Sequence, residues 1–149
     1  MIKLEEVCKV ETRILAVIDD EARAYTINTD FLSDSCKPYE VARNHTMIWL
    51  DEHGFLGEIE CLRPTIVEKP ACHIQGVSHR EGFPRLAVPS PNNISMVQLI
   101  DDGYIIWLAD GKTVDTEIQY KTLQFLFAGD ELTGIVAHGV ITEQDITFH

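Results

Sequence analysis

The residues with the clearest capacity for chemistry are Cys72, His73 and His79, which lie close together in a proline-rich segment. Thiolate and imidazole groups bind zinc, but a site needs three or four ligands that converge on one point, and this spacing matches no strong template. Cys72 is also a poor nucleophile, because adjacent residues on an extended chain point to opposite sides and no oxyanion-forming glycine turn stands beside it. We therefore expect no metal, no cofactor and no catalytic residue.

Two pairs of adjacent carboxylates, Asp19-Asp20 and Asp101-Asp102, are a second candidate for chemistry. General acid–base catalysis needs carboxylates held in different environments inside a cleft. Both pairs fall instead in predicted turns, where aspartate is favoured because its side chain accepts hydrogen bonds from nearby backbone N–H groups. We interpret them as turn residues, and we do not expect an enzyme.

The charge of the chain is more informative, because 24 acidic residues against 12 basic ones give a net charge of −12. Nucleic acid is a poor partner for such a chain, since binding it relies on clustered lysine and arginine. Residues 86–149 hold nine of the acidic residues but only Lys112 and Lys121 among the basic ones. The C-terminal half should therefore project a negative field, with solubility as the competing explanation for the acidic surplus.

Apolar residues repeat with a period of two over much of the chain, which is typical of half-buried β-strands. Turn residues separate five such runs in the second half, at 94–100, 104–109, 114–120, 123–127 and 132–140. The best helix candidate, at 29–43, is interrupted by Pro38. We predict a mainly β fold of antiparallel meanders, which form two packed sheets or two similar lobes with at most one or two short helices.

Three regions are expected along the chain: an N-terminal β lobe at 1–62, a connector at 63–93 and an acidic C-terminal β-meander lobe at 94–149, together one compact unit. The connector is defined by five of the six prolines, which resist helix interiors and central strands and favour a linker or sheet edges. These are Pro64, Pro70, Pro84, Pro89 and Pro91.

The two halves resemble each other in layout. Residues 46–60 align with 122–136 at an offset of 76, with Thr46, Leu50, Leu56 and Ile59 matched by identical residues, and Tyr25 meets Tyr104 at an offset of 79. Internal duplication and chance similarity of two hairpins both stay open. In either case each half is too small to bury one face alone, and stacking the two would complete a core.

Trp107 lies in a strand whose two faces are both apolar, so either the strand is central or a partner covers one face. In the second case Trp107 and the acidic residues near it have the composition of a hot spot for a basic protein. Asp115 and Glu117 alternate with apolar residues and are expected to share an exposed side. The predicted partner-binding residues are Trp107, Asp110, Asp115, Glu117, Asp130 and Glu131.

The stretch 101–137 resembles a small, uncharacterised prokaryotic β domain. The elements that carry the resemblance are Tyr104-Ile105, Asp110-Gly111, Thr116-Glu117-Ile118, Asp130, Leu132 and Gly134-Ile135. They cover roughly the last third of the chain and include no catalytic residues. Members of that family often sit beside small toxin genes, so the resemblance implies a bacterial immunity or antitoxin protein. The first half departs from the pattern, because Glu58 separates Gly57 from Ile59.

Charge and resemblance together predict an immunity protein that neutralises a cationic toxin, with a nuclease as the expected class, by placing carboxylates where phosphates would bind. The alternative is a small-ligand-binding protein or enzyme with a site between the lobes, lined by His73, His79, Arg80 and Arg85 of the connector. A third class is a subunit of a larger assembly.

The expected location is the cytoplasm. No apolar run approaches the roughly 18 residues of a membrane-spanning helix, and the first residues include two glutamates where a secretory signal would have an apolar core. Four scattered cysteines without a CxxC pair favour free thiols, and the apolar run around Cys61 favours the core for that residue.

Overall fold

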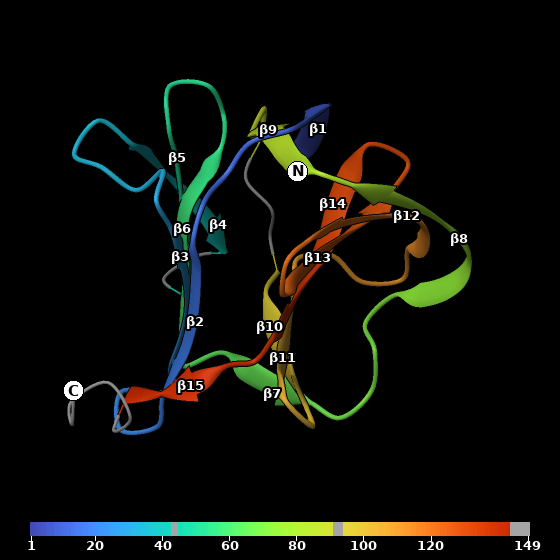
Figure 1. Cartoon of the computed structure of the whole chain (residues 1–149). Coiled ribbons are helices and arrows are strands. Elements are labelled where there is room, and N and C mark those ends of the chain that lie inside the picture. The colour runs from blue at the N-terminus through green and yellow to red at the C-terminus, as the bar shows by residue number, and fades with distance from the viewer. Residues whose placement is uncertain (43–44, 91–93, 144–149) are drawn as a thin grey trace.

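The computed structural model describes residues 1–42, 45–90 and 94–143, and the fifteen elements named β1 to β15 within these residues are all β-strands. The strands form two sheets that lie face to face (Figure 1), which confirms the predicted mainly β fold of two packed sheets. The smaller, six-stranded sheet contains β2 (Ile14–Asp19), β3 (Ala24–Thr29), β4 (Lys37–Ala42), β5 (Thr46–Leu50), β6 (Leu56–Leu62) and β15 (Ile141–Thr142).

The larger, nine-stranded sheet holds the remaining elements. These are β1 (Lys3–Cys8), β7 (Thr65–Val67), β8 (His73–Glu81), β9 (Phe83–Ala87), β10 (Met96–Ile100), β11 (Gly103–Trp107), β12 (Thr113–Tyr120), β13 (Leu123–Ala128) and β14 (Glu131–His138). Strands β10 to β14 coincide with the five runs predicted from alternation, to within two residues at every end.

The best helix candidate, at 29–43, does not form a helix in its described residues. Its described part contains turns at 30–35 and then β4, which begins one residue before Pro38. Strand β4 is the edge of the smaller sheet, where a proline that cannot donate a backbone hydrogen bond is tolerated. Residue 43 of that candidate, Pro91 of the connector and residues 144–149 of the C-terminal lobe lie outside the described residues.

The proline-rich segment forms strands at sheet edges, as its composition predicted. Strands β7 and β8 end the strand order of the larger sheet at opposite sides, and β9 pairs only with β1. Proline is confined to such positions because it has no backbone N–H group, and every residue of an interior strand needs one to pair with a neighbouring strand.

The two halves of the chain have the same strand order. In the smaller sheet the order is β2-β3-β6-β5-β4, and in the larger sheet it is β10-β11-β14-β13-β12. The meander strands also carry a register shift at the same place, next to the pair Leu50–Leu56 in one half and Phe127–Leu132 in the other. The similarity seen in the sequence is therefore a similarity of topology.

The register corrects part of the sequence alignment. Leu56 and Ile59 do correspond to Leu132 and Ile135, but the preceding strand is displaced by one residue, so that Thr46 corresponds to Leu123 rather than to Thr122. The cause is the turn: residues 51–55 separate Leu50 from its partner, whereas only residues 128–131 separate Phe127 from its partner.

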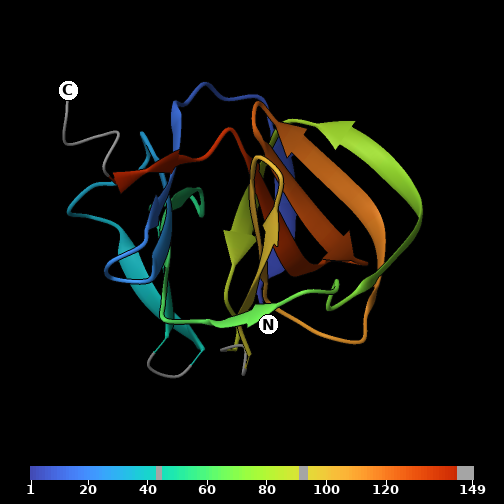
Figure 2. The same cartoon turned by 90° about the horizontal axis from the view of Figure 1, so that it is seen from below.

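Each half gives a strand to the sheet of the other half. After β6 the chain crosses to the larger sheet, where β7 pairs in parallel with β10, and after β14 it crosses back, where β15 pairs in parallel with β2 (Figures 1 and 2). Strand β1 also joins the larger sheet, beside β9 and the start of β14. The sheets therefore do not follow the predicted lobe boundaries at 1–62 and 94–149.

The main core lies between the two sheets and takes residues from both. Tyr25 and Tyr104, which occupy equivalent positions in the two halves, meet there edge to face with ring centroids 5.3 Å apart. The Tyr104 hydroxyl donates to the carbonyl oxygen of Thr26 at 2.9 Å, which satisfies a polar atom in the apolar interior. Cys61 is fully buried, as predicted, and burial raises the pKa of its thiol to about 12.

Candidate functional site

Trp107 lies in a second, smaller core on the outer face of the larger sheet. Its side chain is fully buried, and its indole N–H donates to the Gln98 side-chain oxygen at 2.9 Å. Residues 67–77, from the end of β7 to the first part of β8, cover this cluster, with Cys72 inside it and Val67, Ala71 and Val77 packed against it. Trp107 therefore belongs to the core, and its predicted role as a partner contact is corrected.

Glu117 is also withdrawn from solvent, with 8% of its surface exposed. The expectation that it shares an exposed side with Asp115 is wrong, because the alternation of β12 breaks between Val114, in the second cluster, and Ile118, in the main core. The Glu117 carboxylate accepts a hydrogen bond from the Gln124 amide at 2.6 Å and lies 3.2 Å from a ring nitrogen of His79. Glu117 therefore binds Gln124 and His79 within the larger sheet, and its predicted role as a partner contact is corrected.

The other four predicted residues gather at one end of the larger sheet, which we call the acidic end: Asp110, Asp115, Asp130 and Glu131. The backbone N–H of Gly129 donates to Asp115 at 3.0 Å, which fixes this strand residue beside the turn that holds Asp130 and Glu131. Asp110 lies in the neighbouring turn between β11 and β12.

Two lysines reduce the charge of the acidic end. Lys3 lies 3.3 Å from Asp130, and Lys112 lies 3.6 Å from Glu131. Asp110 and Asp115 are exposed and form no ion pair with any residue that the structure describes. The net charge of the acidic end is therefore about half of what its four carboxylates alone would give.

A chain of hydrogen bonds runs across the outer face of the larger sheet and was not predicted from the sequence. It connects Asp102, His138, Gln124, Glu117 and His79 in that order. The two ring nitrogens of His138 face oxygen atoms, at 2.9 Å from Asp102 and 2.7 Å from Gln124, so both bonds form together only when the imidazole carries two protons. The pairing register of β12, β13 and β14 would have been needed to find this chain.

The Asp102–His138 contact predicts a specific titration. The hydrogen bond from His138 holds the pKa of Asp102 below its ordinary value of 3.8, so this pair stabilises the fold above that pH, and the contribution is lost as pH falls through the lowered folded pKa. Replacing His138 with phenylalanine should return the pKa of Asp102 toward 3.8, measured by NMR of its carboxyl carbon. His53→Phe is the control, and an unchanged Asp102 titration in His138→Phe would contradict the assignment.

The cysteine and histidines of the connector do not converge. The Cys72 thiol is buried, donates to the carbonyl oxygen of Ala109 at 3.3 Å and has its pKa raised by burial. His73 contacts Gln75, whereas His79 contacts Glu117. Across residues 1–42, 45–90 and 94–143, no group of three or more histidine, cysteine, aspartate or glutamate side chains is arranged to hold a metal ion.

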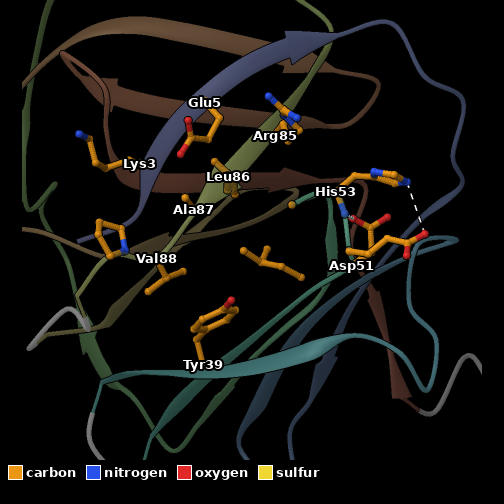
Figure 3. A pocket seen from close by; sticks show the side chains of 13 residues that line it. Lys3, Glu5, Tyr39, Asp51, His53, Arg85, Leu86, Ala87 and Val88 are labelled. Carbon is orange, nitrogen blue, oxygen red and sulfur yellow. Dashed lines mark hydrogen bonds and ion pairs between the residues drawn. The ribbon is translucent and has the colours of Figure 1, made fainter.

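A groove of about 590 Å³ lies where β1 and β9 of the larger sheet approach β4 and the β5–β6 turn of the smaller one (Figure 3). Tyr39, Asp51 and His53 line it from the smaller sheet, and Lys3 and Arg85 line it from the larger. Arg85 pairs with Glu6 at 3.2 Å, while its Nε atom is buried without a hydrogen-bond partner among the described residues.

Of the four connector residues predicted for a site between the lobes, only Arg85 lines this groove. His73, His79 and Arg80 lie on β8, at an edge of the larger sheet.

Comparison with known protein families finds no family model that matches the chain, and comparison with curated proteins finds no match either. Within the described part of the chain there is no helix of the length and apolar character that crossing a bilayer requires.

Proposed function

We propose that this protein is a bacterial immunity or antitoxin protein of the cytoplasm that binds and neutralises a cationic protein toxin, with a nuclease as the expected class. The observation that supports the proposal is the acidic end, where turns and a strand that are separate in the sequence bring Asp110, Asp115, Asp130 and Glu131 together. Such a surface attracts a basic protein over long range and competes with the phosphates that a nuclease binds.

The two lysine pairs of the acidic end suit a reversible protein contact. Lys3 and Lys112 hold Asp130 and Glu131 in place, and the exposed carboxylates of Asp110 and Asp115, which form no ion pair with a described residue, can meet basic side chains of the partner. Exposed charges of this kind act mainly on the association rate and on partner choice. The acidic surplus of the whole chain adds to the same field.

Charge reversal at the acidic end tests the proposal. Asp110→Lys combined with Asp130→Lys changes two exposed turn residues, and it should slow association with a basic nuclease toxin that the unaltered chain neutralises by about tenfold or more at low salt. The measurement is stopped-flow association at several salt concentrations, together with rescue of cells that produce this basic protein.

The matched control is Glu21→Lys with Asp34→Lys, which makes the same change in net charge at exposed residues of the smaller sheet. The control should retain rescue, and both double variants should stay folded because exposed substitutions cost little stability. Equal rescue by both variants would contradict the proposed role of the acidic end and would indicate that the acidic surplus serves solubility.

The groove between the sheets supports a second candidate function, the binding of a small anionic ligand. The buried Nε atom of Arg85 has no partner among the described residues, and a ligand oxygen in the groove would satisfy it. A ligand that binds only the folded protein raises its melting temperature, so a thermal-shift screen with Arg85→Lys as the comparison separates this function from protein binding.

A further inference from the structure

The outward face of the smaller sheet combines carboxylates with large apolar side chains. Ile27, Ile48 and Ile59 are buried in the main core, so the residues that alternate with them point away from it. We call these outward residues the open face: Thr26, Asn28, Glu40, Met47, Trp49, Glu58 and Glu60. All of them retain partial or full exposure to solvent.

Strand register places these residues in two rows across the sheet. Asn28 lies opposite Glu58, and Glu58 lies opposite Trp49. In the adjacent row Glu60 lies between Thr26 and Met47. Directly opposite side chains in neighbouring strands are about 5 Å apart at Cβ, so each glutamate stands beside a large side chain on one side and a small polar one on the other.

The corresponding face of the larger sheet is covered by the chain itself. Because the two sheets share one strand order, Asn28, Trp49 and Glu60 correspond to Trp107, Leu126 and Val136. Those three residues are buried beneath residues 67–77. Equivalent positions of the two sheets therefore differ in character. They are apolar in the larger sheet, where residues 67–77 cover them, and on the open face of the smaller sheet they include carboxylates and the half-buried Trp49.

Charge on the open face is unbalanced. None of the outward positions of β2 to β6 holds lysine or arginine, and Glu58 and Glu60 form no ion pair with a residue that the structure describes. Burial, and secondarily the neighbouring Glu60, raise the pKa of Glu58. The ionised carboxylate is therefore destabilised at this position, and a nearby cation would stabilise it. The face therefore favours a cationic occupant.

Asn28 identifies which cation fits. Its side-chain oxygen is buried and accepts no hydrogen bond from the described residues. A guanidinium group carries several N–H donors in one plane, so it can donate to this oxygen and to Glu58 while its flat face stacks on the Trp49 indole. A lysine ammonium offers neither the plane nor the fork of donors.

A second copy of this chain is a poor occupant. Two open faces brought together would place the carboxylates of Glu40, Glu58 and Glu60 from both copies in one interface without a basic residue from either face. Like charges across an interface cost several kcal/mol and suppress such a pairing.

We propose that the open face binds an extended segment of a cationic partner through an arginine that stacks on Trp49 and bonds to Glu58 and Asn28. A second arginine two residues along the segment would reach Glu60, because alternate residues of an extended chain repeat at about 7 Å, as Glu58 and Glu60 do on β6. The inference rests on the proposed function only in taking the partner to be a cationic protein.

The test uses the full chain and a blocked seven-residue peptide that contains two arginines separated by one valine. The chain has two tryptophans, so NMR of the indole N–H signals reports separately on Trp49 at the open face and on the buried Trp107. We expect the peptide to shift the Trp49 signal and leave the Trp107 signal in place. The same peptide with lysine in place of arginine should bind several-fold more weakly.

Glu58→Gln keeps the size of the side chain and should weaken peptide binding about tenfold, the usual effect of losing one charged hydrogen bond. Trp49→Leu should weaken it as well, and Glu21→Gln, at an exposed turn of the same sheet, is the matched control. Absence of peptide binding, equal affinity for the lysine peptide, or unchanged affinity in Glu58→Gln would overturn the proposal. So would a Trp49 signal that shifts with protein concentration alone, which would assign the face to a second copy.

Failure of the arginine site and failure of the immunity function would give different results. Peptide binding at the open face without any protection of cells would sink the immunity function and keep the arginine site. Protection that depends on the acidic end, combined with no peptide binding, would keep the immunity function and remove the arginine site.

Discussion

Replacing Trp107 with alanine is expected to lower the free energy of unfolding by about 3–5 kcal/mol, the range for removing a large aromatic side chain from a core. The indole is fully buried in the second cluster, and its N–H bonds to Gln98, so the substitution leaves both a cavity and an unpaired amide oxygen. Chemical denaturation at constant temperature, followed by circular dichroism, measures the loss.

Trp49→Ala is the internal control for this prediction, because Trp49 is only half-buried on the open face. It should cost much less than Trp107→Ala, and Trp107→Phe should fall between the two because it refills part of the cavity. A Trp107→Ala protein with nearly unchanged stability would mean that residues 67–77 do not cover this side chain in solution.

A fragment of residues 1–62 is expected to be unfolded on its own. It would lack β15, the partner of β2, and its β1 would have neither β9 nor β14 to pair with. It would also expose Ile27, Ile48 and Ile59, whose burial depends on the larger sheet. Circular dichroism of the separate fragment should therefore lack the spectrum of a β-sheet.

Mixing this fragment with residues 63–149 should restore the sheet spectrum in a one-to-one complex, because the two pieces together contain every strand. In the intact, unsubstituted chain, the native indole N–H signals of Trp49 and Trp107, followed by NMR, should disappear at the same denaturant concentration, as expected of one cooperative unit. Independent folding of residues 1–62, or two separate midpoints, would contradict this interpretation of the strand exchange.

Much of the fold could be predicted because alternation is a local signal. Strands β10 to β14 follow from runs such as that of β13, in which Leu123, Phe125 and Phe127 face the core. Strand β8 could not be found in this way, since His73–Glu81 is almost wholly exposed and has no apolar alternation. Its place in the sheet comes from pairing with β12, a partner distant in the sequence.

The candidate site was predicted less well than the fold, for reasons that lie in register. The prediction for Glu117 failed because an irregularity in β12 turns Val114 and Ile118 to opposite faces. No residue in this strand is of a type that would indicate such an irregularity from the sequence. Trp49 and Glu58 are nine residues apart in the sequence, and only the pairing of β5 with β6 makes them neighbours. A register set by a five-residue turn is beyond what alternation alone can specify.

The exchange of β7 and β15 has a consequence for how the two halves come to be in one chain. A molecule with only one half would complete the edge of its sheet only by pairing with another copy, and its assembly would depend on concentration. Joining the halves covalently makes that encounter intramolecular, at an effective concentration in the millimolar range for a short flexible linker. The present chain thus has the topology of a strand-swapped dimer whose two halves are covalently joined. The outer face of the larger sheet is covered by residues 67–77, and the outer face of the smaller sheet is left open.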